Sequence, residues 1–230
     1  MKLEYLYPEL GNLYGDGANF RYLRRCLPEA AAVETPLGSE PAFVSDPEVV
    51  FLYSGPMTER GQGMALEALR PWSSALLERL EGGMHALFTG SSMELLGKTI
   101  TAGDTVLEGL GLADLASRRE QGFFLGQAEG FEITAFQSRF SQSTPGPALQ
   151  GAFRVIRGFG LEDGCAFEGY RFHNLLGTYL LGPLLVLNPL LTKRFLSSLG
   201  VEREPAFFAE ALQAYEARLT EFRDKGRKPF

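Results

Sequence analysis

Short apolar segments alternate with longer amphipathic ones through the first half of the chain. Apolar residues recur every three to four positions over residues 60–80 and again over 19–27, which is the period of a helix packed through one face. The short segments are bounded by Gly, Pro or Ser and predict buried strands over residues 3–7, 49–53 and 85–89. This alternation predicts an α/β fold, in which a mostly parallel sheet lies between two helical layers.

The second half of the chain is richer in predicted strands and ends in two predicted helices. The strands are expected over residues 131–136, 152–157 and 175–180, and the helices over residues 188–199 and 205–223. Residues 35–46 and 141–147 contain Pro and Gly and predict surface loops rather than domain linkers. We therefore expect a single domain over residues 1–230.

Composition and charge narrow the classes of partner. The 230 residues include 28 acidic and 22 basic side chains, for a formal net charge of −6. Neutralisation of phosphates by Lys and Arg dominates nucleic-acid binding, so this balance argues against nucleic acid as a partner. The N-terminal segment lacks the unbroken apolar stretch of a signal peptide, and Gly and Pro interrupt the most apolar segment, residues 175–191. We expect a cytoplasmic protein without membrane insertion.

Two histidines and two cysteines limit the chemistry that is available. Cys26 and Cys165 form no CxxC pair, which favours a reduced chain without disulfides. His85 and His173 have no partner ligand at metal-binding spacing, so both are expected to be structural. No glycine-rich phosphate-binding motif is present, and we expect neither a metal nor another cofactor.

Residues 85–97 predict a strand, a sharp turn and a helix, the arrangement that presents a nucleophile in many α/β enzymes. Ser91 or Ser92 would lie at the turn, but the GxSxG pattern is missing and His85 lies at the far end of the strand. A serine nucleophile needs a base within hydrogen-bonding distance. The sequence therefore favours a second interpretation, in which Ser91 or Ser92 caps a helix that begins near Met93.

A second turn follows the first predicted strand, at residues 12–19. Gly15 and Gly17 permit a tight turn there. Asp16 is either the N-cap of the first helix or a polar group directed into a site. The local pattern favours neither of these interpretations over the other.

Taken together, these segments resemble a known family. The matching segments are residues 10–19, residues 103–112 (G-D-T-V-L-E-G-L-G-L), residues 158–160, Glu168-Gly169, residues 176–185 (L-G-T-Y-L-L-G-P-L-L) and Asn188-Pro189. They are similar to motifs of the class I glutamine amidotransferases of the cobyric acid synthase (CobB/CobQ) type, and above all to the glutaminase subunits of lipid II isoglutaminyl synthases. The resemblance extends over nearly the full length of the chain and implies a three-layer, flavodoxin-like fold.

That family hydrolyses glutamine at a Cys–His pair and passes the ammonia to a partner synthetase. The resemblance places the cysteine at Gly90, in the segment G-S-S-M-E-L-L-G, and the histidine at Leu181. Glycine has no side chain to acylate and leucine cannot transfer a proton, so both halves of covalent catalysis are missing. The resemblance thus implies the fold of the family around a degenerate glutaminase site.

Other positions of the implied site also depart from the family pattern. An arginine that holds the substrate carboxylate falls on Phe123, which removes a bidentate clamp. The family's G-G-G-x-D stretch becomes residues 53–57, in which Gly55 remains at a substrate-binding position and Met57 replaces the aspartate. Among the polar site residues of the family, the resemblance retains Asp16.

The expected function follows from this combination. We expect a glutamine amidotransferase-like subunit that binds or regulates a Mur ligase-like, ATP-dependent partner in cell-wall or cobyric-acid-type amidation, with a residual pocket open to a small-molecule ligand. The alternative is an enzyme of altered chemistry, a hydrolase or amidotransferase, that uses Ser91, Ser92 or Glu94, the last as an acid or base whose pKa burial would raise. Glutamine hydrolysis through a residue supplied by the partner is a third interpretation.

Overall fold

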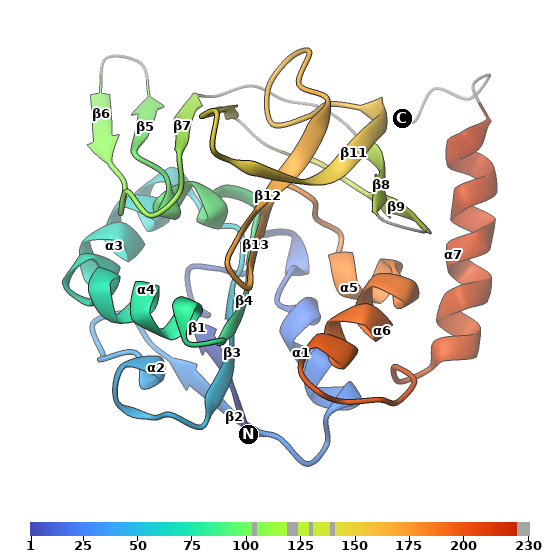
Figure 1. Cartoon of the computed structure of the whole chain (residues 1–230), viewed down its shortest axis with the longest axis horizontal. Coiled ribbons are helices and arrows are strands. Elements are labelled where there is room, and N and C mark those ends of the chain that lie inside the picture. Colours follow the sequence, from blue (N-terminus) through green and yellow to red (C-terminus); the bar gives the residue numbers. More distant parts are fainter. Residues whose placement is uncertain (103–104, 119–123, 129–130, 139–140, 225–230) are drawn as a thin grey trace.

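The computed structural model describes residues 1–102, 105–118, 124–128, 131–138 and 141–224. These residues fold around a nine-stranded sheet with the order β2-β1-β3-β4-β13-β12-β11-β8-β9 (Figure 1). In that order, the strands are Ala31–Thr35, Lys2–Leu6, Val49–Ser54, His85–Thr89, Leu175–Thr178, Phe167–Phe172, Gln150–Gly158, Phe124–Ala128 and Phe131–Ala135. The predicted α/β class is confirmed.

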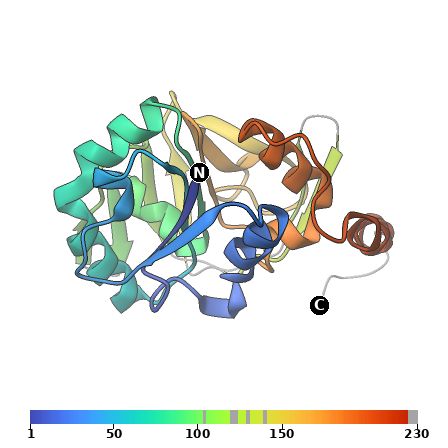
Figure 2. The ribbon, with the colours of Figure 1, turned by 90° about the horizontal axis from the view of Figure 1, so that it is seen from below.

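The first five strands in this order, β2, β1, β3, β4 and β13, run parallel, as the alternation of strands and helices predicts. Successive side chains point to opposite faces, so Leu52 of β3 joins one apolar cluster while Phe51 and Tyr53 join the other. Helices cover both faces and complete three layers (Figure 2). The first face carries α2 (Ala42–Ser45), α3 (Glu59–Leu69) and α4 (Ser73–Glu81), and the second carries α1 (Ala18–Cys26), α5 (Leu184–Leu187) and α6 (Pro189–Ser198).

Beyond β13 the sheet continues with antiparallel strands. The last helix, α7 (Phe208–Arg223), packs against β9 at the far end of this extension. The Tyr215 hydroxyl donates to the carbonyl oxygen of Glu132 (2.6 Å), and Arg223 pairs with the Glu132 carboxylate. These contacts join the C-terminal helix to the antiparallel edge of the sheet.

A second sheet, of four strands among the described residues, has the order β10-β7-β5-β6. In that order, the strands are Gln142–Pro145, Leu115–Arg118, Thr99–Ala102 and Thr105–Glu108. The prediction of a surface loop over residues 141–147 is therefore wrong for β10. Its backbone partners belong to β7, and no local pattern reveals them. Pro145 is tolerated because β10 is an edge strand.

The predicted helix over residues 60–80 is also interrupted. α3 ends at Leu69, the short 3₁₀ turn η2 (Arg70–Trp72) follows, and α4 begins at Ser73. Pro71 lies at the interruption, where it lacks an N–H and its ring crowds the preceding turn. The apolar period continues across the break, which explains why the sequence pattern suggests a single helix. In the described part of the chain, no helix combines the length and the apolar composition needed to cross a bilayer.

Candidate functional site

β4 ends in a sharp turn at Gly90, at the carboxyl edge of the parallel strands. Gly90 has a φ of +57° and begins the 3₁₀ helix η3 (Gly90–Leu96). This φ lies in the left-handed region, which glycine adopts without the steric cost of a Cβ atom. The predicted strand and turn are thus present, with a 3₁₀ helix after them. The backbone has the form of a nucleophile elbow, but no side chain extends from it.

The space beside Gly90 is filled. A Cβ atom on Gly90 would lie 2.6 Å from Cβ of Pro56 and 3.2 Å from Cδ2 of Leu181. Leu181 is fully buried, and its backbone forms two hydrogen bonds with Phe136, with N···O distances of 2.8 and 3.2 Å. The structure therefore brings Gly90 and Leu181 together, and places an unpredicted residue, Pro56, against both.

Gly55 and Met57 hold Pro56 in this position. A Cβ atom on Gly55 would lie 2.0 Å from the carbonyl oxygen of Gly11, so the two loops can approach this closely only at a glycine. Met57 is buried, and its backbone N–H and carbonyl both bond to Oγ of Ser91, at 3.0 and 2.8 Å. The loop after β3 is thereby fixed between the first loop of the chain and η3.

Ser91 and Ser92 do not cap a helix, so that prediction is wrong. Because η3 begins at Gly90, both serines lie inside it, and the side chain of Thr89 at the N-cap position makes no capping bond. The Ser91 hydroxyl bonds to the loop after β3 instead. Oγ of Ser92 lies 2.8 Å from the carbonyl oxygens of both Ser54 and Thr89. Ser91 thus ties the turn to the loop after β3, and Ser92 ties it to the ends of β3 and β4.

Glu94 is 1% exposed and contributes to the wall of a cleft beside the turn. Its Oε2 accepts a hydrogen bond from Nε2 of Gln62 (2.7 Å), and its Oε1 accepts one from the Tyr179 hydroxyl (2.8 Å). The Tyr179 oxygen also lies 2.5 Å from Oγ of Ser143, which hydrogen-bonds to Ser117 at 2.7 Å. This chain of polar groups connects η3 with α3, with the end of β13 and with the second sheet.

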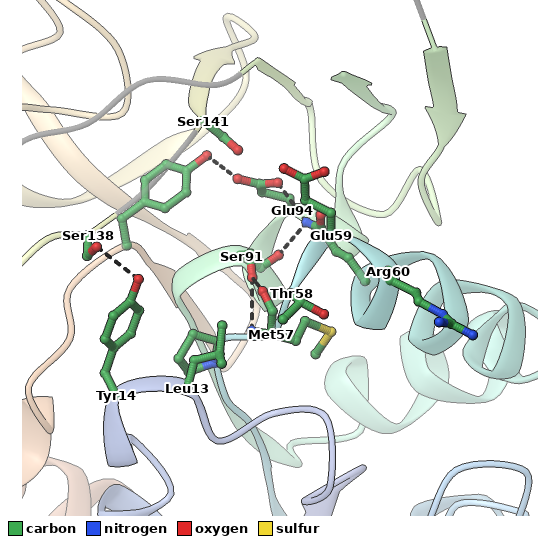
Figure 3. A pocket seen from close by; sticks show the side chains of 13 residues that line it. Leu13, Tyr14, Met57, Thr58, Glu59, Arg60, Ser91, Glu94, Ser138 and Ser141 are labelled. Carbon is green, nitrogen blue, oxygen red and sulfur yellow. Dashed lines mark hydrogen bonds between the residues drawn. The ribbon is translucent and has the colours of Figure 1, made fainter. Parts of the chain in front are cut away.

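The cleft has a volume of about 430 Å³ and opens beside Ser91 (Figure 3). Pro56 also contributes to its lining. Sites for small molecules commonly have volumes of about 300–1,000 Å³. Its lining combines apolar groups with the carboxylates of Glu59 and Glu94. At one side the Tyr14 hydroxyl hydrogen-bonds to Ser138 (2.9 Å). The cleft is thus large enough for a small polar molecule, and it lies next to the closed turn.

Asp16 lies among the ends of the strands and is not the N-cap of α1, a position that Gly17 takes. Its Oδ2 accepts hydrogen bonds from Thr89 (2.6 Å) and from the Tyr53 hydroxyl (2.9 Å), while Oδ1 accepts from the N–H of Gly182 (3.3 Å). Burial raises the pKa of the Asp16 carboxyl, and the hydrogen bonds oppose this shift. The carboxyl joins β3 and β4 to the segment after β13.

The other chemically reactive residues lie away from this turn. His85 begins β4 at its opposite end, where burial lowers the pKa of the imidazole, and His173 lies between β12 and β13. Cys26 is buried on α1 and Cys165 lies in the loop before β12, and both are free thiols. Phe123 lies outside the described residues. In the part of the chain that the structure describes, no group of three or more His, Cys, Asp or Glu side chains could hold a metal ion.

The sequence pattern does not mark Tyr53, Thr89, Gln62, Tyr179 or Pro56 as site residues. Tyr53 and Thr89 do lie at the carboxyl ends of predicted strands, where ligands bind in α/β sheets, so their position along the chain indicates a place near the site. Gln62 and Tyr179 contribute by contacting a residue distant in sequence, and no local pattern marks such contacts. The position of Pro56 likewise depends on how two loops meet.

Comparison with known proteins identifies a curated relative. The GatD subunit of the glutamine-hydrolysing lipid II isoglutaminyl synthase of Staphylococcus aureus (strain N315) is 31% identical to this chain over 184 residues. The match covers 77% of this chain and 75% of the relative. No family model matches the chain.

Solved structures share the fold at lower identity. A glutamine amidotransferase gives a TM-score of 0.54 at 16% identity and covers 86% of this chain and 100% of its own. PurLQS from Thermotoga maritima gives 0.57 at 12% identity, over 95% and 98% of the two chains. A glutamine amidotransferase from the same organism gives 0.53 at 11% identity, over 96% and 98%. At these identities the likeness concerns the fold, and it confirms the predicted three-layer, flavodoxin-like architecture.

Proposed function

The chain belongs to the family of the GatD subunit of lipid II isoglutaminyl synthase, and we propose that it is a CobB/CobQ-type amidotransferase-like subunit without glutaminase activity of its own. The closed turn carries this proposal. Gly90 offers no nucleophile, and Pro56 and Leu181 occupy the space that a side chain there would need. Covalent amide hydrolysis requires a nucleophile with a proton acceptor beside it, and neither Gly90 nor Leu181 can fill these roles.

A preserved fold around a closed site fits a protein that acts through a partner. The GatD relative is itself named as a subunit of a synthase. We propose that this chain acts as one domain in the cytoplasm and binds or regulates a Mur ligase-like, ATP-dependent subunit. The partner would carry out amidation of a cell-wall precursor or a cobyric-acid-type substrate. The cleft beside Ser91 and Glu94 would take a small polar ligand.

Affinity purification from the native host tests the partnership. We expect the tagged chain to copurify with an ATP-dependent ligase in stoichiometric amount, identified by mass spectrometry. Recovery of the chain without any ligase-like protein would contradict the proposed partnership.

An ammonia assay tests the loss of glutaminase activity. Glutamine is incubated with the purified chain, alone and with its partner, and ammonia release is compared with that of heat-denatured protein. We expect no difference, because no nucleophile is available at Gly90. Ammonia released at an enzymatic rate by the chain alone would overturn the proposal. Release that requires the partner would favour hydrolysis through a residue supplied by that partner.

A second candidate function is an enzyme of altered chemistry, which the burial of Glu94 at the cleft favours. A buried carboxyl at a cleft can serve as a general acid or base. Hydrolase profiling with Ser91→Ala, Ser92→Ala and Glu94→Gln tests this function, with Glu59→Gln as a matched change in the cleft lining. An activity that Glu94→Gln abolishes and Glu59→Gln preserves would support it. Activities unchanged in all variants would exclude it.

A further inference from the structure

The outer face of α1 carries three arginines, Arg21, Arg24 and Arg25. Their spacing of three and four residues places them on one side of the helix, and all three are exposed. They line a shallow hollow of about 400 Å³. Within the described ranges no carboxylate forms an ion pair with them, whereas the neighbouring Arg203 is paired with Glu29. In a chain of net charge −6, this face is a local excess of positive charge.

Phe207 adds an exposed aromatic ring to this face. It is 62% exposed, the most exposed large apolar side chain in the described part of the chain. The guanidinium of Arg25 lies 5.7 Å from the centroid of its ring. Phe207 has a φ of +56°, in the left-handed region that is unfavourable for a residue with a Cβ atom. The ring is therefore presented to solvent on a constrained backbone.

The segment that presents Phe207 is attached to α1. The Tyr22 hydroxyl donates to the carbonyl oxygen of Ala206 (2.8 Å), and the Ala206 N–H donates to Sγ of Cys26 (3.3 Å). Figure 1 shows this segment passing from α6 to α7 beside the end of α1. The three arginines and Phe207, here called the basic face, therefore form one preorganised surface.

We propose that the basic face binds the headgroups of an anionic lipid membrane. Guanidinium groups bind phosphate oxygens bidentately, and aromatic rings settle at the level of the headgroups. The described lining of the hollow is entirely arginine and Phe207 is largely exposed, so both the cations and the ring are accessible to a bilayer surface. The proposal is independent of the proposed function, because it needs neither a partner subunit nor a catalytic site.

Sedimentation with vesicles tests this binding on the purified full-length chain. Vesicles of phosphatidylcholine alone are compared with vesicles of equal parts phosphatidylcholine and phosphatidylglycerol. We expect binding to the anionic vesicles only, and weaker binding as salt is added, because salt screens exposed charges. The triple variant Arg21→Gln/Arg24→Gln/Arg25→Gln should lower the partition coefficient about a hundredfold, since each cation near an anionic surface contributes about one kcal/mol.

Two further variants separate the proposal from general charge and folding effects. Arg70→Gln/Lys98→Gln/Arg171→Gln removes the same charge from exposed positions elsewhere and should change the partition coefficient less than about threefold. Phe207→Gly places glycine at a left-handed φ, so it should preserve thermal stability and still lower vesicle binding about tenfold through the lost apolar contact.

Three results would overturn the proposal. One is equal binding to neutral and anionic vesicles, and another is an equal loss of binding in the two triple variants. The third is the absence of vesicle binding together with binding to polyglutamate that requires the three arginines of α1. This result would assign the basic face to an acidic protein segment instead. None of these results bears on the ligase partner or on glutamine hydrolysis. Failure of the membrane-binding proposal is therefore distinguishable from failure of the proposed function.

Discussion

A Cβ atom on Gly90 would lie 2.6 Å from Cβ of Pro56, a separation that real Cβ atoms essentially never show. The turn at the end of β4 is therefore compatible only with glycine while Pro56 remains in place. The family resemblance assigns the missing nucleophile to this position. At this position a side chain is absent, and Pro56 of the neighbouring loop fills the space that one would need.

We predict that Gly90→Ala destabilises the protein by about 2–4 kcal/mol, from the left-handed backbone and the overlap with Pro56. Gly200→Ala is the matched control, because Gly200 has a φ of +76° and nothing within 4 Å of its added Cβ. The control should cost only about 1–2 kcal/mol. Urea denaturation gives both free energies of unfolding, and equal losses would contradict the overlap.

We predict that Pro56→Gly relieves the cost of Gly90→Ala. The overlapping atom is Cβ of Pro56, so its removal should reduce the cost of the second change by about 1–3 kcal/mol. Pro56→Ala retains that atom and should give no relief. A double-mutant cycle measured by urea denaturation isolates this coupling, and a coupling energy near zero in the glycine background would refute the proposed contact.

The buried carboxyl of Asp16 predicts a pH dependence of stability. Because burial raises its pKa in the folded state, the folded protein binds this proton more tightly than the unfolded chain does. Its stabilising contribution is complete below the ordinary pKa of 3.8 and is lost as pH rises through the raised folded-state value. The destabilisation caused by Asp16→Asn should therefore be largest at acidic pH and decrease toward neutral pH. Urea denaturation over a pH series checks this, and a destabilisation that grows with pH would contradict it.

We predict that removal of the buried Tyr179 hydroxyl destabilises the protein more than removal of a similar hydroxyl at the surface. Tyr179→Phe removes the donor to Glu94 and leaves buried polar groups short of a partner, which should cost about 1–3 kcal/mol. Tyr14→Phe removes the hydrogen bond from an exposed side chain to Ser138 and should cost less than about 0.5 kcal/mol. Thermal unfolding of the two variants compares them directly, and similar melting temperatures would argue against a structural role for the buried chain of hydrogen bonds.

We predict that the buried carboxylate of Glu4 stabilises the fold. It is fully buried on β1, where Oε1 accepts from the Thr35 hydroxyl (2.6 Å) and the Ala42 N–H (2.7 Å), and Oε2 accepts from the Phe43 N–H (2.8 Å). Glu4→Gln replaces an acceptor by a donor and should cost about 1–3 kcal/mol. Glu34→Gln, on the exposed side of the adjacent strand β2, should be within about 0.5 kcal/mol of wild type. Chemical denaturation of both variants tests the difference.

Local sequence patterns predicted the strands and helices that show a clear periodicity of apolar residues. The apolar strand over residues 85–89 and the helix over residues 19–27 form close to their predicted bounds, because burial of an alternating or helical face depends on short-range periodicity. The break at Pro71 and strand β10 were not predicted. The continuing apolar period obscured the first, and the second depends on pairing with a strand distant in sequence.

The sequence by itself determined that Gly90 can supply no nucleophile and that Leu181 can supply no base. Only the tertiary structure decided that Pro56 closes the space above Gly90, that Asp16 lies among the strand ends rather than at an N-cap, and that Ser91 bonds to the loop after β3. The chemistry of a side chain is a property of its residue type. Its surroundings depend on how distant loops pack, because steric overlap and burial arise only between segments that the fold brings together.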